Sequence, residues 1–202
     1  MRELRSIVLA SASPRRRELL VSLGLRVRVA PSDVDEGERP GCGPAELALA
    51  HARAKSDAAA AREREGVIVA ADTVVDLEGK SLGKPRNAAE AAATLAALAG
   101  REHIVHTAFV VVDNPGGRRI VRSSSTRVRF APLSSEQIAQ YVATGEPMDK
   151  AGAYGIQGRG AALVERIDGD FYTVMGFPLG EFVRSLPELG YVLPSSSVAS
   201  PA

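Results

Sequence analysis

Apolar runs and amphipathic stretches alternate in the first third of the chain, a pattern typical of strands joined by helices. Continuous apolar runs at 7–10 and 67–70 predict short strands that are buried on both faces. Ser13 and Pro14 predict the N-cap and the first turn of a helix that ends at Gly24. Three further elements are expected before residue 67: an alternating strand at 25–29, a loop at 30–43 and an Ala-rich helix at 44–65.

Turn signals dominate the middle of the chain and predict antiparallel hairpins. Asn114-Pro115-Gly116-Gly117 is a strong turn signal between two strand-like segments. Glu78-Gly79-Lys80 is a second turn signal of this kind. The two hairpins expected from these turns are 73–77 with 81–82, and 104–113 with 119–130.

Two more helices are expected from their N-terminal residues. Asn87 with Glu90 has the spacing of a capping box, and Gly100 ends this helix. Ser134 with Gln137 has the same spacing. The last expected elements, in chain order, are a Gly-rich loop at 151–160, a strand at 161–167, a turn at 168–169 and a helix at 178–186.

The order of these elements predicts the α/β class. A strand–helix–strand start followed by antiparallel hairpins implies a mixed sheet flanked by helices. The length of 202 residues favours one domain, which we expect at 1–193 because no linker interrupts it. The tail at 194–202 is rich in Ser, Pro and Ala, and we expect it to be disordered.

Composition and charge exclude several classes of protein. Lys and Arg number 25 against 24 Asp and Glu, a net charge of +1 that argues against binding to nucleic acid or to an anionic membrane. No apolar stretch approaches the ~18 residues of a membrane-spanning helix. Cys42 is the single cysteine, so we expect no disulfide within the chain and a cytoplasmic location.

The first candidate for chemistry is the segment from Ser11 to Arg17, which connects a buried strand to a helix N-terminus. Free backbone N–H groups and the helix dipole attract anions at such a junction. The hydroxyls of Ser11 and Ser13 and the guanidinium groups of Arg15 and Arg16 add further donors, which suits a polyphosphate. The alternative is a capping serine followed by solvated arginines.

Asp72 and Thr73 follow the buried run at 67–70. Ligands of open α/β sheets bind beyond the carboxyl ends of strands. A carboxylate at this place can hold Mg²⁺ or act as a general base on a water molecule. The alternative is an ordinary turn or edge aspartate.

The acidic loop and two lysines give weaker signals. Acidic residues cluster at 33–38, Glu36 among them, and carboxylates in a loop suit a hard cation or are simply solvated. Lys55 and Lys84 stand out in an Arg-rich chain because a lysine offers a compact charge, although each could equally be a surface residue.

The Gly-rich segment from Asp149 to Gly160 is the last candidate. Glycines let the backbone approach a ligand, and the Gln157 side chain can bind a base edge with one donor and one acceptor. The alternative is a flexible loop.

His51, His103 and His106 do not group with acidic residues in a metal-binding pattern, so all three are interpreted as structural.

Taken together, these motifs resemble the Maf family over nearly the whole chain outside the tail. They occur in the family's order and continue to Gly176-Phe177-Pro178-Leu179. The motifs that carry the resemblance are Leu9-Ala10-Ser11, Ser13-Pro14-Arg15-Arg16, Ala71-Asp72-Thr73, Gly83-Lys84-Pro85 and Asp149-Lys150-Ala151-Gly152-Ala153-Tyr154-Gly155-Ile156-Gln157-Gly158.

The resemblance implies a fold like that of the inosine triphosphatases, an elongated mixed sheet with a cleft between two lobes. It implies a nucleoside triphosphate pyrophosphatase that cleaves between the α- and β-phosphates, requires Mg²⁺ or Mn²⁺, and forms a homodimer. The forms Ala71-Asp72-Thr73 and Tyr154 to Gln157 resemble the subgroup that acts on dTTP and UTP. CTP and modified pyrimidine nucleotides are further candidate substrates.

The resemblance also assigns expected roles to residues. Asp72 would be the proton acceptor, and substrate choice would depend on Arg15, Thr73 and Gln157. Glu36 and Asp72 would hold the metal. The phosphates would be bound by Ser11, Ser13, Arg15, Arg16, Lys55 and Lys84. An alternative function is a nucleotide-binding regulatory protein linked to septum formation and cell division.

Overall fold

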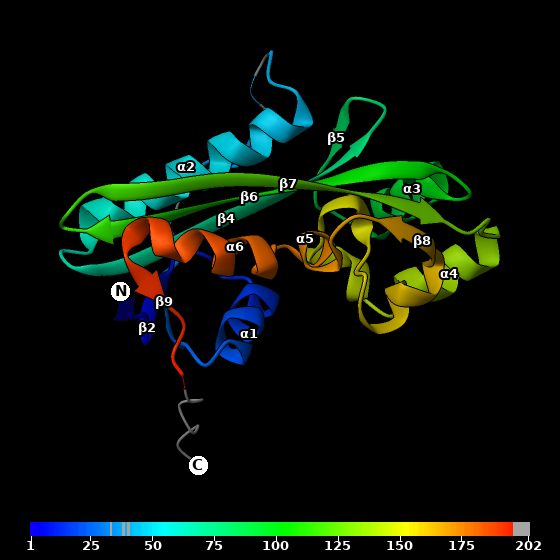
Figure 1. The fold of residues 1–202 in the computed structure, drawn as a ribbon. Coiled ribbons are helices and arrows are strands. Elements are labelled where there is room, and N and C mark those ends of the chain that lie inside the picture. The colour runs from blue at the N-terminus through cyan, green and yellow to red at the C-terminus, as the bar shows by residue number, and fades with distance from the viewer. Residues whose placement is uncertain (33, 38, 40, 196–202) are drawn as a thin grey trace.

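The computed structural model describes residues 1–32, 34–37, 39 and 41–195. Within these residues the chain forms a seven-stranded mixed sheet with helices on both faces (Figure 1), so the predicted fold class is confirmed. The spatial order of the sheet is β3–β2–β4–β6–β7–β8, and β5 pairs with β4 off this path. Its strands are β2 (Ser6–Leu9), β3 (Arg26–Val29), β4 (Gly66–Leu77), β5 (Lys80–Leu82), β6 (Glu102–Asn114), β7 (Arg118–Phe130) and β8 (Val164–Asp168).

The strand directions agree with the order of elements along the sequence. β2 is parallel to β3 and β4, as the helical connections require. The pairs β4–β6, β6–β7 and β7–β8 are antiparallel. A second, two-stranded sheet brings the chain ends together by pairing β1 (Arg2–Glu3) with β9 (Tyr191–Val192). The predicted disorder at 194–202 falls largely on residues 196–202, which lie outside the described residues.

The helices divide the sheet into two faces. Figure 1 shows α2 along one face of the long strands and α1, α5 and α6 on the other face. α3 and α4 lie toward the end of these strands that is away from the N-terminus. The helices are α1 (Pro14–Ser22), α2 (Pro44–Arg62), α3 (Ala88–Leu98), α4 (Ser135–Ala143), α5 (Phe171–Met175) and α6 (Leu179–Ser185). Short 3₁₀ helices are η1 (Glu146–Asp149), η2 (Ala151–Ala153), η3 (Gly158–Leu163) and η4 (Leu186–Leu189).

The core follows the alternation of side chains along β4. Ile68 and Val74 pack on the α2 side, whereas Val69 and Ala71 pack on the opposite side with residues of α1 and α6. Farther along, Val75 packs with α3 and α4. One long strand therefore contributes to three apolar clusters and fixes the positions of the helices around it.

Several local predictions were wrong in detail. The strand expected at 161–167 begins at Val164, because Gly158–Leu163 forms η3. Asn87 caps α3, but the Glu90 carboxylate accepts the backbone N–H of Arg86 and so completes no capping box. The helix expected at 44–65 ends at Arg62. None of the described helices has the length and apolar character needed to cross a membrane.

Candidate active site

A gap in the sheet leaves part of one edge of β4 uncovered. β2 pairs with β4 only as far as Val69, and β5 pairs with it only from Val75. Among the described strands, none covers residues 70–74 on this edge. A cavity of about 760 Å³ opens here, a size typical of small-molecule sites.

Asp72 and Thr73 reach this cavity from opposite faces of the sheet. Successive side chains of a strand alternate, so Asp72 lies on the α2 side and Thr73 on the α1 side. The expectation that they follow a strand end was wrong for β4, which continues to Leu77 because β6 pairs along it. They do lie beyond the carboxyl end of the neighbouring β2, where the parallel part of the sheet stops.

A carboxylate–ammonium cluster lies on the α2 side. Lys55 Nζ is 2.6 Å from Asp72 Oδ1 and 2.9 Å from Glu36 Oε1. Lys55 and Asp72 are buried, so the ammonium offsets the cost of keeping the Asp72 charge away from water. Of the other acids in this loop, Asp35 binds the backbone N–H of Gly37, and Asp33 and Glu38 lie outside the described residues.

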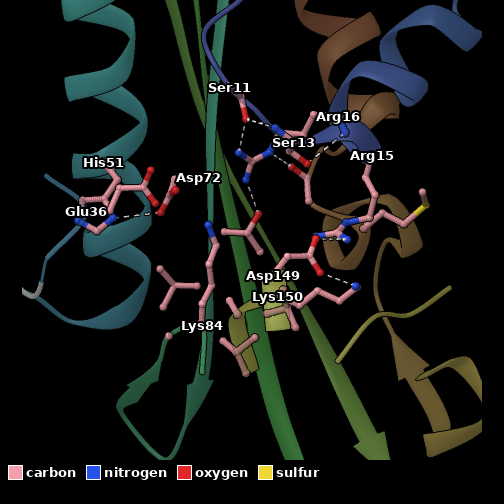
Figure 2. Close-up of a pocket in the computed structure, with 18 of the residues that line it drawn as sticks. Ser11, Ser13, Arg15, Arg16, Glu36, His51, Asp72, Lys84, Asp149 and Lys150 are labelled. Atoms are coloured by element: carbon pink, nitrogen blue, oxygen red, sulfur yellow. Dashed lines mark hydrogen bonds and ion pairs between the residues drawn. The ribbon is translucent and has the colours of Figure 1, made fainter. Parts of the chain in front are cut away.

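His51, interpreted from the sequence as a structural residue, contacts the candidate base and belongs to the same cluster. It precedes Lys55 by one helical turn of α2, and its Nδ1 lies 3.1 Å from Asp72 Oδ2. Its Nε2 lies 3.1 Å from the carbonyl oxygen of Gly37, next to Glu36. The buried ring therefore connects the Asp72 carboxylate to the loop that carries Glu36 (Figure 2).

Arg16 lies on the α1 side and is also buried. Its guanidinium donates to Ser11 Oγ at 3.0 Å, to Thr73 Oγ1 at 3.0 Å and to the carbonyl oxygen of Gly176 at 2.9 Å. Burial lowers the pKa of the Arg16 guanidinium, while the charges of Asp72 and Glu36 oppose that shift. The group remains a cation and presents a fixed positive charge at the cavity wall.

Arg15 lies next to Arg16 and faces a different partner. Its guanidinium is 3.3 Å from Asp149 Oδ2, and Lys150 Nζ is 2.7 Å from Asp149 Oδ1. Burial raises the pKa of Asp149, but its hydrogen bond from Lys150 and the charges of Lys150 and Arg15 lower that pKa overall. These contacts connect the start of α1 to the C-terminal end of η1 (Figure 2).

The remaining predicted residues, Ser13, Lys84 and Gln157, also line the cavity. Lys84 and Gln157 are exposed, and neither side chain forms a hydrogen bond or ion pair within the described part of the chain. Ser13 caps α1 by accepting the backbone N–H of Arg16. Figure 2 shows Lys84 between the Asp72 cluster and Asp149. The Lys84 ammonium and the Gln157 amide are therefore available to a ligand.

The structure brings every predicted site residue to this one cavity. The lining includes Ser11, Ser13, Arg15, Arg16, Glu36, Lys55, Asp72, Thr73, Lys84 and Gln157. Cationic side chains surround a small set of carboxylates, which is the arrangement expected for a ligand with several phosphates and a cation.

Comparison with known proteins decides the family. The sequence model described as Maf-like protein matches residues 6–189. The chain belongs to the Maf family. This Maf chain is 51% identical, over 91% of its length and 95% of the relative's, to a protein of Moorella thermoacetica named dTTP/UTP pyrophosphatase. A protein of the same name from Symbiobacterium thermophilum is 48% identical over 93% of this Maf chain and 96% of its own length.

Solved structures similar to this Maf chain include a HAM1 protein from Coxiella burnetii. The similarity has a TM-score of 0.49 and 17% identity, over 91% of this chain and 99% of that one. The Ham1 protein of Staphylococcus aureus matches with a TM-score of 0.48 and 18% identity, over 79% of this chain and 80% of that one.

Proposed function

We propose that this Maf protein is a nucleoside triphosphate pyrophosphatase that acts on dTTP and UTP. It hydrolyses the bond between the α- and β-phosphates and releases the nucleoside monophosphate and pyrophosphate. The names of its relatives support this activity, since they are dTTP/UTP pyrophosphatases of 48% and 51% identity. The geometry around Asp72 supports it independently.

The position and contacts of Asp72 are the observation that best supports this reaction. Asp72 is a buried carboxylate at the open edge of β4, held by Lys55 on one oxygen and His51 on the other. A carboxylate fixed in this way beside a cavity can orient a water molecule and take its proton as the water adds to phosphorus. Asp72 is the residue that we assign as general base.

The arginine and lysine side chains of the cavity supply the positive charge that binding and cleaving a triphosphate requires. When the bond between the α- and β-phosphates breaks, the bridging oxygen leaves with the pyrophosphate and gains a negative charge, so fixed positive groups stabilise the transition state. Arg16 is positioned by Ser11 and Thr73. The exposed Lys84 side chain forms no hydrogen bond or ion pair with the described residues, so it can move toward the leaving group. We assign Ser11, Ser13, Arg15, Arg16, Lys55 and Lys84 to phosphate binding, and Arg15, Thr73 and Gln157 to substrate choice.

Mg²⁺ or Mn²⁺ is the cofactor that the family resemblance implies, and Glu36 and Asp72 fit it. Both supply carboxylate oxygens, and both face the point now occupied by Lys55 Nζ. Mg²⁺ is often held by one or two carboxylates together with substrate phosphates. That mode agrees with the described residues, in which no three His, Cys, Asp or Glu side chains are placed to hold a metal ion by themselves. When bound, the cation would neutralise phosphate oxygens.

The test is pyrophosphate release from a panel of nucleoside triphosphates, with Mg²⁺ or Mn²⁺ and with EDTA. The panel contains dTTP, UTP, CTP, GTP, ATP, 7-methyl-GTP and modified pyrimidine nucleotides. Metal-dependent release that favours dTTP and UTP supports the proposal. Nucleotide binding without release from any member would favour the regulatory alternative linked to septum formation.

We also propose a cytoplasmic homodimer. A lone free thiol, the exposed Cys42, suits a reducing compartment. The dimer is implied by the family resemblance alone. Light scattering on the purified chain measures its mass directly, and a monomer at micromolar concentration would contradict this part of the proposal.

A further inference from the structure

Glu146, at the start of η1, binds the backbone of the loop that carries Gln157. Its Oε1 accepts the Gly160 N–H at 3.1 Å, and its Oε2 accepts the Arg159 N–H at 3.0 Å. Burial raises the pKa of Glu146, but the hydrogen bonds from the backbone N–H groups and the nearby Lys150 charge lower that pKa overall. The ionised carboxylate therefore holds the residues just after Gln157.

Tyr141 on α4 holds the same loop on its other side. Its hydroxyl donates to Glu146 Oε1 at 2.9 Å and accepts the Gly155 N–H at 3.2 Å. Burial raises the pKa of Tyr141, so the phenol keeps the proton that this bond to Glu146 needs. Gly155 precedes Gln157 by two residues, and the loop is thus bound both before and after the side chain that faces the cavity.

Two glycines show how closely the loop packs on these side chains. A Cβ at Gly160 would lie 2.6 Å from Tyr141 Oη and 2.3 Å from the Gly155 carbonyl oxygen. A Cβ at Gly158 would lie 2.9 Å from Glu146 Oε2, and its φ of +68° favours glycine in any case. The backbone therefore rests directly on Glu146 and Tyr141.

Gln157 itself is positioned by this backbone. Its side chain is exposed to the cavity and forms no hydrogen bond with the described residues. Neither Glu146 nor Tyr141 lines the cavity, so they act on a ligand only through the loop.

We propose that Glu146 and Tyr141 are positioning residues for base selection. They hold Gln157 where it can bind the pyrimidine. This inference rests on the proposed function, since it assumes that Gln157 contacts the base. It assigns no catalytic step to either residue.

A double-mutant cycle tests the coupling. Glu146→Gln keeps the shape of the side chain but places an amide against two N–H donors. We expect the preference for UTP over GTP, as a ratio of kcat/KM, to fall about tenfold in Glu146→Gln and in Gln157→Ala. In the double variant, the preference should be no lower than in Gln157→Ala alone, because no Gln157 side chain remains to be positioned.

One control and a second test variant separate this result from general damage. Glu136→Gln changes an exposed carboxylate on α4 and should leave the preference unchanged. Tyr141→Phe removes one hydroxyl, should lower the preference in the same non-additive way, and carries the test if Glu146→Gln fails to fold.

The binding of UTP and GTP to each variant, measured by calorimetry in an Asp72→Asn background, gives the same ratio without turnover. This arm keeps the inference testable even if the wild-type chain releases no pyrophosphate, which would contradict only the proposed function. Losses that add in the double variant, or an unchanged preference in Glu146→Gln and Tyr141→Phe, would overturn the inference.

Discussion

Lys55 and Asp72 form a buried ion pair in the wall of the cavity, with 2.6 Å between Nζ and Oδ1. Their side chains are only 6% and 9% exposed. Removing one member of such a pair leaves the other charge away from water without its partner, which is costly. The pair therefore couples the stability of this part of the fold to the residue that we assign as the base.

Replacing Lys55 should destabilise the protein. We expect Lys55→Met to lower the free energy of unfolding by about 3 kcal/mol, because Asp72 and Glu36 lose their shared cation. Urea denaturation measures the change. Lys80→Met, at an exposed position of β5, is the matched control and should have little effect. Equal unfolding midpoints for both variants would contradict the assigned role of the pair.

Replacing Glu36 should weaken metal binding. Glu36→Gln removes one of the two carboxylates that face the cation position, and we expect the affinity for Mn²⁺ to fall by at least about tenfold. Electron paramagnetic resonance of free Mn²⁺ measures the affinity without turnover. Glu65→Gln changes an exposed carboxylate between α2 and β4 and serves as the control. If both variants bind Mn²⁺ like the wild type, Glu36 is not a ligand.

Replacing Gln157 should change substrate choice more than chemistry. We expect Gln157→Ala to reduce the preference for UTP over GTP about tenfold, because one hydrogen-bonded pair with the base is lost. The expected effect is mainly on KM, since Gln157 is not among the contacts of Asp72 within the described residues and takes no part in breaking the phosphate bond. Steady-state kinetics with both nucleotides provide the measurement. An unchanged preference would remove Gln157 from the base site.

His103 should make stability depend on pH. Burial lowers the pKa of His103 from its ordinary 6.5 to about 4, so the unfolded chain binds the proton more tightly than the folded one. Its contribution to stability is complete above pH 6.5 and is lost as the pH falls toward 4, by roughly 3 kcal/mol. His103→Phe should flatten the pH dependence of the unfolding free energy between pH 6.5 and 5. Parallel profiles for the two proteins would contradict this assignment.

Local signals identified much of the site from sequence. The junction from Ser11 to Arg16 was predictable because a buried run, a cap and a proline are adjacent in the chain. The position of Asp72 after an apolar run identifies it as a candidate. The sequence does not predict where β4 ends, because the length of β4 depends on its pairing with β6. A distant partner of this kind leaves no local pattern.

The residues that were missed make their contacts through tertiary structure. His51 had one usable signal, since it precedes Lys55 by four positions and so shares its helix face. Glu146 and Tyr141 had none, because their partners lie in a loop whose path is set by glycines that also suit plain flexibility. Sequence alone could not separate those two interpretations.

The most direct test of the account is the turnover of UTP by Asp72→Asn beside the wild type. Pyrophosphate release is measured with saturating Mg²⁺, and Asp76→Asn, four residues along the same strand and outside the cavity, is the control. We predict that kcat falls about 100-fold or more in Asp72→Asn, as expected for loss of a general base, and stays near the wild-type value in Asp76→Asn. Near-normal turnover by Asp72→Asn would contradict the assignment of Asp72 as the base, and with it the proposed mechanism.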